Sequence, residues 1–279
     1  MLSYRHGFHA GNHADVLKHG ICAFVARYML QKDAPVLFLD THAGAGVYDL
    51  GSPEAQKTAE YREGIARLLP HAADAPELLR DYLALVRSFN PDGGLHTYPG
   101  SPSLIMAMMR DQDRALFHEL HPTDESRLSE LVRRHPRIHV EKSDGMRGLI
   151  AHLPPPERRA LCLIDPSYEI KTDYALVTAA VTRAWKKFPG GIFIWWYPVI
   201  DRSRVRAMEV AMRAAGLRKT YRVELCMAPD KPERGMTGSG LFIVNPPYTL
   251  PDAATAALPW LADKLGANGP LTAGWLLPE

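Results

Sequence analysis

The sequence predicts an α/β protein with a doubly wound, mostly parallel sheet of seven strands and a helical insertion. Three observations predict this fold: short apolar runs end in acidic residues, helical patterns alternate with these runs, and the first run opens into a glycine-rich turn. Strands of a parallel sheet are buried on both faces and read as continuous apolar runs, which helices connect. We therefore expect a ligand site beyond the carboxyl ends of the strands.

The length and composition are those of a compact soluble protein. The 279 residues suit one large domain, or one domain with an insertion. With 46% hydrophobic and 23% charged residues, disorder is not expected. No apolar run reaches the length of a membrane span, and the first residues lack the apolar core of a signal peptide. The three scattered cysteines suggest no disulfide framework, so we expect a cytoplasmic protein.

The charge pattern does not define a partner by itself. The net charge of +2 is too small to imply nucleic acid. Basic residues gather at 133–137, 202–206 and 213–222, beside or on predicted helices. Each cluster is read first as a solvated helix face, although together they could follow a phosphate backbone.

The first third of the chain carries a helix, a strand and the insertion. A helix is predicted over 12–30, with Asn12 as N-cap and Asp15 in the first turn. A strand over 36–40 ends at Asp40 and leads into the turn 41–46. Residues 53–93 show helical stripes punctuated by prolines, with no strand pattern. We expect 53–93 to form an inserted helical subdomain within a domain made of 1–52 and 94–279.

The alternation of strands and helices resumes at Ser101. That serine is expected to be the N-cap of a helix through Met109, with Pro102 at its first position. Further strands are predicted at 115–119, 138–141, 161–165, 192–196, 221–227 and 241–245, and further helices at 124–135, 174–188 and 204–215. Acidic residues at or just after four of the strands are Asp40, Glu119, Asp144 and Asp165. Each acid alone could be a helix cap, but four together indicate a ligand site.

The glycine-rich turn favours S-adenosyl-L-methionine (SAM) over a dinucleotide. Gly44 and Gly46 are present, but Asp49 occupies the third position of the G-x-G-x-x-G fingerprint, and no Walker lysine follows. Asp40 would suit the ammonium of a methionine-type group rather than a pyrophosphate. Glu119, at the end of the second strand, is the acid expected to bind ribose hydroxyls.

The segment Asp165-Pro166-Ser167-Tyr168 follows the fourth strand and resembles the Asp/Asn-Pro-Pro-Tyr/Phe motif of amino-group methyltransferases. The lone pair of an adenine amine is delocalised, so the nitrogen is a poor nucleophile. A carboxylate and a main-chain carbonyl that accept its two N–H groups favour a pyramidal nitrogen, and the carboxylate can take the proton. Asp165 and Pro166 supply these oxygens, and Tyr168 is expected to stack on a flipped-out base.

A second segment, Asn245-Pro246-Pro247-Tyr248, matches that motif better by sequence alone. Only 31 residues follow Tyr248 (279 − 248), too few for the remaining elements of such a sheet. We expect these prolines to stop strand pairing and turn the chain, and we choose Asp165.

The N-terminal stretch is rich in histidine, at His6, His9, His13 and His19, and a metal site with His42 or Asp15 is conceivable. It contains no H-E-x-x-H or paired C-x-x-C pattern, so no metal is predicted. A lid or ligand contact is the preferred interpretation, with Tyr4 and Phe8 available for stacking and Arg5 and Lys18 for phosphate.

Taken together, these segments resemble the bacterial 23S rRNA adenine-N6 methyltransferase family RlmJ, and the similarity runs from Met1 to Glu279. The matching motifs are Tyr4-Arg5-His6, the block from Phe8 to His19, the block from Leu39 to Gly46, Tyr98-Pro99-Gly100-Ser101-Pro102, Glu119-Leu120-His121-Pro122 and Arg234-Gly235-Met236-Thr237. The resemblance implies a Rossmann-like SAM-dependent fold and a monomeric enzyme that methylates one adenine of 23S rRNA, naked or in an assembling large subunit.

The resemblance also implies roles for individual residues. Tyr4 would contact substrate RNA near the reacting base, with Arg5 and His6 beside it, and Asp165 would be the catalytic acceptor. The residues implied to line the SAM pocket are Lys18, His19, His42, Ser101, Glu119, Asp144, Gly145 and Asp165, to which the turn adds Asp40 and Gly44. One position departs from the family pattern, since Ser167 replaces the usual second proline.

Two other functions remain open at this point. The same four-residue motif would serve methylation of DNA adenine or of a protein amide, because both targets are poorly nucleophilic nitrogens. A third interpretation is a catalytically weak SAM-binding protein that acts in RNA binding or ribosome assembly, which Ser167 alone suggests.

Overall fold

The computed structural model describes residues 5–230 and 235–278. Its strands are β1 (Leu37–Asp40), β2 (Val47–Asp49), β3 (Thr97–Pro99), β4 (Arg114–His118), β5 (Ile138–Glu141), β6 (Ala160–Ile164), β7 (Ile192–Val199), β8 (Thr220–Cys226), β9 (Gly238–Val244) and β10 (Leu271–Leu277). Its α-helices are α1 (His13–Leu30), α2 (Pro53–Thr58), α3 (Ile65–Leu68), α4 (Glu77–Ser88), α5 (Ser101–Met108), α6 (Pro122–Val132), α7 (Gly145–Ala151), α8 (Asp173–Lys187), α9 (Arg202–Ala214) and α10 (Leu250–Leu265). The 3-10 helices are η1 (His6–Phe8), η2 (Glu60–Glu63) and η3 (Leu69–Asp74).

The main sheet has eight strands in the order β10-β8-β9-β7-β6-β1-β4-β5. The five strands β5, β4, β1, β6 and β7 are paired in parallel, and β9 runs antiparallel to both β7 and β8. All seven predicted strands are present, so the α/β class is confirmed. The count of seven was wrong, because β10 adds an antiparallel strand beside β8. Leu271 and Trp275 of β10 are exposed, so this edge strand lacks the continuous apolar run of a buried strand.

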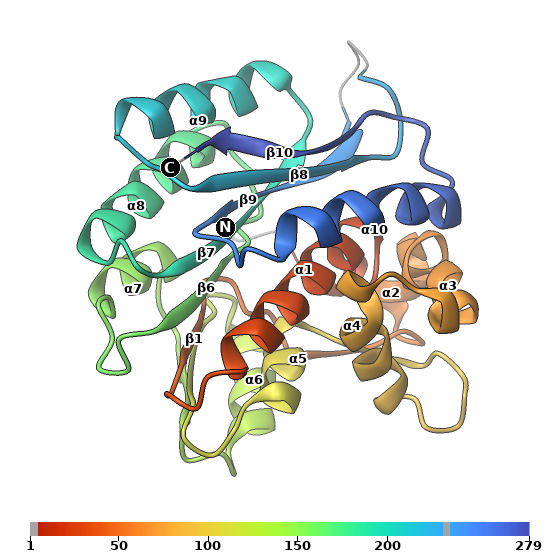
Figure 1. Ribbon diagram of the computed structural model, residues 1–279. Coiled ribbons are helices and arrows are strands. Elements are labelled where there is room, and N and C mark those ends of the chain that lie inside the picture. The colour runs from red at the N-terminus through yellow and green to blue at the C-terminus, as the bar shows by residue number, and fades with distance from the viewer. Residues whose placement is uncertain (1–4, 231–234, 279) are drawn as a thin grey trace.

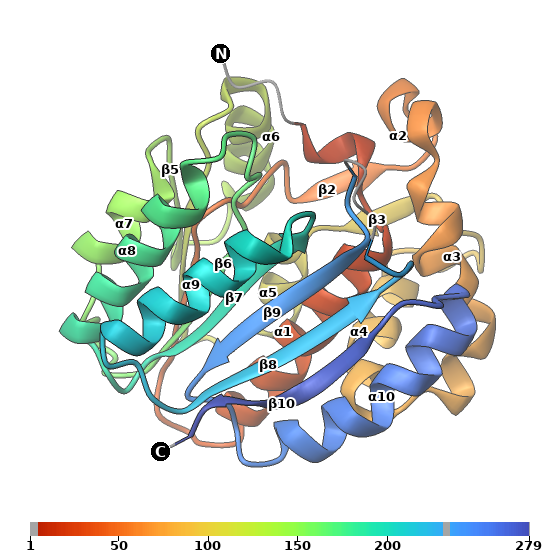
Figure 2. The same ribbon diagram turned by 90° about the horizontal axis from the view of Figure 1, so that it is seen from above.

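Helices cover both faces of the sheet. Figures 1 and 2 show α7, α8 and α9 on one face and α1, α4, α5 and α10 on the other. Alternate residues of β1 supply the two cores, with Phe38 in one cluster and Leu37 and Leu39 in the other. Every residue of β1 is buried, as expected for a central parallel strand.

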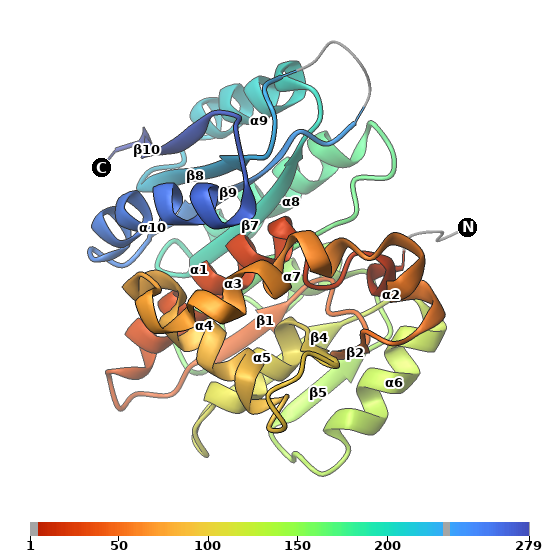
Figure 3. The ribbon, with the colours of Figure 1, turned by 90° about the vertical axis from the view of Figure 1, so that its right-hand side faces the viewer.

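The segment between β2 and β3 is helical throughout its regular structure. It contains α2, α3 and α4 with η2 and η3, and α4 packs against α1 and α10 (Figure 3). Tyr82 and Val86 of α4 are fully buried and belong to the same core cluster as the apolar side chains of α1. This helical segment therefore contacts α1, the helix that carries Lys18 and His19.

Two predicted helix starts can be compared with the structure. Asn12 caps α1, and its side chain accepts the N–H groups of Ala14 and Asp15 at 2.9 and 3.0 Å. The prediction that Ser101 caps α5 was wrong: the N-cap is Gly100, and the Ser101 hydroxyl is used elsewhere. No helix in the described ranges combines the length and apolarity that crossing a bilayer would need.

Candidate active site

A cavity of about 800 Å³ opens at the carboxyl ends of β1, β4 and β6, within the size range of small-molecule sites. The predicted site residues that line it are His6, Lys18, His19, His42, Gly44, Ser101, Glu119, Asp144, Gly145, Asp165 and Pro166. Three predicted residues, Arg5, Asp40 and Tyr168, do not line it. Tyr4 lies outside the described residues.

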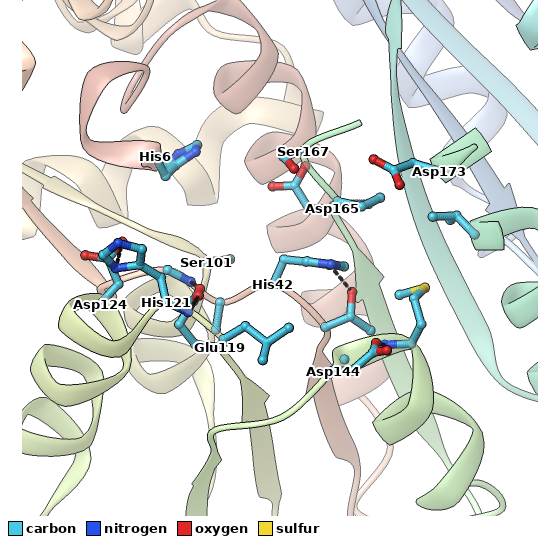
Figure 4. A pocket seen from close by; sticks show the side chains of 18 of the residues that line it. His6, His42, Ser101, Glu119, His121, Asp124, Asp144, Asp165, Ser167 and Asp173 are labelled. Carbon is cyan, nitrogen blue, oxygen red and sulfur yellow. Dashed lines mark hydrogen bonds and ion pairs between the residues drawn. The ribbon is translucent and has the colours of Figure 1, made fainter. Parts of the chain in front are cut away.

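The sheet register explains why distant residues meet here. β1 lies between β4 and β6, with Asp40 opposite Leu163 on β6 and Phe117 on β4. The segments that follow these three strands therefore leave the sheet side by side. In Figure 4, Asp165 and Ser167 lie above His42, while Glu119 and Asp144 lie below it. The chain order around β1 also reverses at this point, which is where doubly wound sheets bind their ligands.

A buried lysine holds the Asp165 carboxylate. The Lys18 ammonium, on α1, forms an ion pair with Asp165 and lies 2.8 Å from Asp15 Oδ1. The Lys18 side chain is 3% exposed and that of Asp165 is 15% exposed, so water screens this contact little. Lys18 also lies over the Trp196 ring, 5.9 Å from its centroid. One cation thus sits between two carboxylates at the inner end of the cavity.

Burial and charge act in opposite directions on these groups. Burial raises the pKa of Asp165 above its ordinary value, although Lys18 and His6 both pull it down. Burial would lower the pKa of Lys18, but Asp15 and Asp165 more than offset this and raise it. The pKa of Asp15 lies well below its usual value because His6 and Lys18 outweigh its burial. Asp15 therefore stays charged, and Asp165 becomes a better proton acceptor than a surface aspartate.

His6 joins the same network from η1. Its Nε2 lies 2.9 Å from Asp15 Oδ2, which also accepts the Gly11 main-chain N–H at 2.9 Å. Arg5 points elsewhere, and its guanidinium donates to Glu54 Oε1 at 2.9 Å. Of the described N-terminal candidates for RNA contact, His6 reaches the cavity and Arg5 lies outside its wall.

The opposite side of the cavity carries Glu119. Its Oε2 accepts the Gly44 N–H and its Oε1 accepts the His121 N–H, both at 2.7 Å. Burial raises the pKa of Glu119, against the effect of these two N–H groups. Each carboxylate oxygen keeps a lone pair, so the group can also accept hydroxyl donors from a ribose. Gly44 has φ +63°, and a Cβ there would overlap the Tyr48 hydroxyl, so the turn needs glycine.

The third part of the wall is the start of α7. Asp144 caps this helix, with Oδ1 accepting the Met146 N–H at 2.8 Å. Gly145 packs so closely on the turn after β1 that a Cβ would overlap the Thr41 carbonyl oxygen. His42 Nδ1 lies 2.8 Å from Thr41 Oγ1, and burial lowers the pKa of His42 to about 4. A neutral imidazole and an acidic helix cap therefore flank this end of the cavity.

Asp40 lies behind the wall rather than in it, contrary to the direct ligand role expected for it. It is fully buried, with Oδ1 accepting the His42 N–H at 3.1 Å and Oδ2 accepting the Ser101 hydroxyl at 2.6 Å. Burial raises its pKa to about 6. The strand buries this side chain, so Asp40 positions Ser101 and His42, both of which do line the cavity.

Tyr168 also differs from expectation. Its ring packs at 4.5 Å from the Tyr174 ring, centroid to centroid, and 7% of the residue is exposed. Its hydroxyl donates to the Trp196 carbonyl at 3.0 Å and accepts the Trp195 indole N–H at 2.8 Å. The residue has φ +51°, a left-handed conformation that these contacts hold in place. The Tyr168 side chain thus stabilises the loop after Pro166 through contacts in the protein interior. Its buried ring is not accessible for stacking on a base.

The second motif match, at Asn245, lies at the opposite end of the sheet, beside the amino ends of the parallel strands. β9 runs antiparallel to β7, with Val244 opposite Phe193 near the start of β7, so Asn245 emerges away from the cavity. The Asn245 amide donates to the carbonyls of Pro189 and Gly191, both at 2.7 Å. This segment ends strand pairing and turns the chain toward α10, as predicted.

Sequence reasoning assigned no role to several residues that line the cavity. They are Thr41, Tyr48, His121, Asp124, Ser143, Met146, Asp173 and Leu176. Asp15 was interpreted as a first-turn acid or a conceivable metal ligand, and its contact with Lys18 was not expected. A further group, His118, Glu141 and His152, places potential metal-ligand atoms within 4.8 Å of one another. His118 Nδ1 lies 2.9 Å from Ser143 Oγ, and we assign no metal to this group.

Comparison with known proteins decides the family. The family model described as "Ribosomal RNA large subunit methyltransferase D, RlmJ" matches residues 33–277. The chain is 46% identical to the Escherichia coli (strain K12) protein "Ribosomal RNA large subunit methyltransferase J", over 100% of both chains. It is 42% identical to the Haemophilus influenzae protein of the same name, again over 100% of both.

The chain belongs to the RlmJ family. A crystal structure of the protein LPL1258 from Legionella pneumophila str. Philadelphia 1 has a TM-score of 0.87 and 36% identity, and the match covers 95% of this chain and 98% of that one. Membership makes the chain a methyltransferase with a Rossmann-like fold, and S-adenosyl-L-methionine is its cofactor.

The cavity fits the cofactor of the RlmJ family. Gly44 lets the turn approach a nucleoside closely, and Glu119 offers carboxylate oxygens that a ribose diol would need. At the inner end, Asp165 connects the cavity wall to the charged network of Lys18 and Asp15. The donor set therefore suits a nucleoside with an amino-acid tail.

Proposed function

We propose that the chain methylates N6 of a single adenine in 23S rRNA. The observation that carries the proposal is the Asp165 carboxylate, which lines the cavity together with Pro166 and is held by a buried lysine. The names of the curated relatives support ribosomal RNA of the large subunit as the substrate. We further propose that the enzyme acts in the cytoplasm as a monomer, on naked rRNA or on an assembling large subunit.

The proposed chemistry follows from the two oxygens at the start of this loop. The Asp165 carboxylate accepts one N–H of the adenine amine and the Pro166 carbonyl accepts the other, which makes the nitrogen lone pair available. Bound SAM supplies an electrophilic methyl group on its sulfonium. As the nitrogen gains positive charge, Asp165 takes its proton, a role that the raised pKa of this carboxyl supports.

Lys18 orients this carboxylate. The ion pair leaves the other lone pairs of Asp165 free to accept the incoming amine. Asp15 holds the Lys18 ammonium in place from the other side. We propose that His6, on the far side of Asp15, meets the RNA near the reacting base, together with Tyr4 and Arg5. Ser167 leaves the loop less rigid than a second proline would, which would slow the reaction through misplacement of Asp165.

The test is mass mapping of methylated adenines in rRNA from cells that lack this protein and then regain it. We expect one adenine of 23S rRNA to lose and regain its methyl group, and Asp165→Ala to bind RNA without restoring the modification. Asn245→Ala is the matched control, since it alters the other motif match and should restore the methyl group. Offering the purified enzyme RNA, DNA and protein together separates the alternatives, because methylation of DNA or protein in place of RNA would overturn the proposal.

A further inference from the structure

A chain of three buried side chains links the insertion to the cavity. Tyr82, on α4, lies with its hydroxyl 3.0 Å from that of Tyr98, on β3. The Tyr98 hydroxyl lies 2.8 Å from Nδ1 of His19, on α1. All three residues are at most 1% exposed, but His19 also lines the cavity. The insertion thus reaches the site through two phenols and one imidazole.

The direction of these hydrogen bonds follows from counting protons. Burial raises the pKa of both tyrosines, so each hydroxyl carries one proton to donate. Among the described residues, the Tyr82 hydroxyl has one hydrogen-bond partner, the Tyr98 oxygen. If Tyr98 donated to Tyr82, the Tyr82 proton would be buried without an acceptor, at a cost of about 1–3 kcal/mol. Tyr82 therefore donates to Tyr98, and Tyr98 donates to His19 Nδ1.

This direction determines the state of His19. Nδ1 accepts, so in a neutral ring the proton is on Nε2. The ring is neutral because burial lowers the pKa of His19 to about 3. Nε2 lies 3.9 Å from Asp15 Oδ1, too far for a hydrogen bond. Its N–H is therefore available to an acceptor in the cavity.

We propose that Tyr82 and Tyr98 are positioning residues that make His19 Nε2 a hydrogen-bond donor to the carboxylate of the methionine portion of SAM. The inference rests on the proposed function, which places the reacting methyl near Asp165. His19 Nε2 lies 3.9 Å from Asp15 Oδ1, the oxygen that the Lys18 ammonium contacts at 2.8 Å, and Lys18 pairs with Asp165. His19 therefore belongs to the Asp165 end of the cavity, where we place the amino-acid end of the ligand. Glu119 marks the ribose end. Residues 53–93, our proposed inserted subdomain, thereby supply Tyr82 to hold the cofactor site.

The test compares two ligands that differ in the amino-acid tail. S-adenosylhomocysteine keeps the carboxylate, and 5′-methylthioadenosine lacks the whole tail. Calorimetry should show that Tyr98→Phe raises the Kd for S-adenosylhomocysteine by about tenfold, the worth of one such hydrogen bond. Tyr82→Phe should raise this Kd by about threefold, because the Tyr98 hydroxyl can still donate to His19 but no longer accepts the hydrogen bond that fixes its orientation. The Kd for methylthioadenosine should not change in either variant.

Tyr197→Phe is the matched control, since it also removes a buried phenol, whose hydroxyl donates to Glu224 at 2.8 Å, and should leave both Kd values unchanged. Nitrogen-15 NMR of the ligand-free wild type should show His19 protonated at Nε2, a readout that needs no variant to fold. A proton on Nδ1, or equal losses of affinity for both ligands in Tyr98→Phe, would overturn the relay while leaving the proposed function intact. Failure of the wild type to bind S-adenosylhomocysteine would overturn both.

Discussion

The ammonium of Lys18 forms an ion pair with the carboxylate of Asp165, although 147 positions separate them in the chain. The same ammonium lies 2.8 Å from Asp15, whose other oxygen meets His6 at 2.9 Å. The proposed proton acceptor is therefore the end of a charged network that begins in the N-terminal histidine-rich stretch.

Removing the lysine should change the pH dependence of methyl transfer. Burial raises the pKa of Asp165 from the ordinary 3.8, and Lys18 partly offsets this rise. Lys18→Met removes the offset, so the pKa of Asp165 should rise further. Since the carboxylate is the active form, the rate is lost as pH falls through this pKa, and the acid limb should move to higher pH. Single-turnover rates over a pH series measure it.

The same variant should lose about 3 kcal/mol of unfolding free energy, because it leaves a buried carboxylate without its cation. Lys264→Met is the control, since Lys264 pairs with Asp263 near the surface. An acid limb at the wild-type pH in Lys18→Met would contradict the assignment of Asp165 as the titrating group.

Asp40 should make stability fall with rising pH. Burial raises its pKa to about 6 from 3.8, so the unfolded chain ionises first. The folded state therefore binds more protons between these values, and stability declines as pH rises from about 4 to about 6, by about 3 kcal/mol from this group. Asp40→Asn, which can keep the contacts to Ser101 and His42, should remove that decline. Urea denaturation at several pH values measures it, and an unchanged slope in the variant would exclude Asp40 as its source.

Tyr168→Phe separates an inner structural role from base stacking. The variant keeps the ring but loses the hydroxyl contacts with Trp195 and Trp196, so the free energy of unfolding should fall by about 1–2 kcal/mol. Methyl transfer should slow because the loop that carries Asp165 is less firmly held. Thermal denaturation and single-turnover rates measure the two effects. Full stability with a normal rate would show that the hydroxyl contacts contribute nothing.

Gly145→Ala should damage the cofactor end of the site. The added Cβ would overlap the Thr41 carbonyl oxygen, so α7 must shift away from the turn after β1, at a cost of about 1–3 kcal/mol in stability. Because Asp144 caps α7 and lines the cavity, binding of S-adenosylhomocysteine should weaken together with stability. Gly190→Ala is the control, since no atom lies within 4 Å of its Cβ position. Equal stability and affinity in both variants would contradict the close packing at Gly145.

Much of the fold could be predicted because each central strand is buried on both faces. The apolar runs that end at Asp40 and Asp165 are of this kind, and both strands lie where the pattern predicted. β10 was missed because most residues of this edge strand are exposed or half-buried, a pattern around Gly274 that resembles a loop. The acids at the strand ends also indicated correctly where the cavity lies, since parallel strands bring their carboxyl ends together.

The sequence by itself determined where the central strands lie along the chain, which acidic residues follow them, and the family. Only the tertiary structure decided which way each side chain points. Tyr168 turns inward because two tryptophans hold its hydroxyl, and Asp40 is covered because its strand is central. The pairing of Lys18 with Asp165 depends on α1 packing beside the sheet, and such contacts between distant segments leave no periodic trace in a sequence.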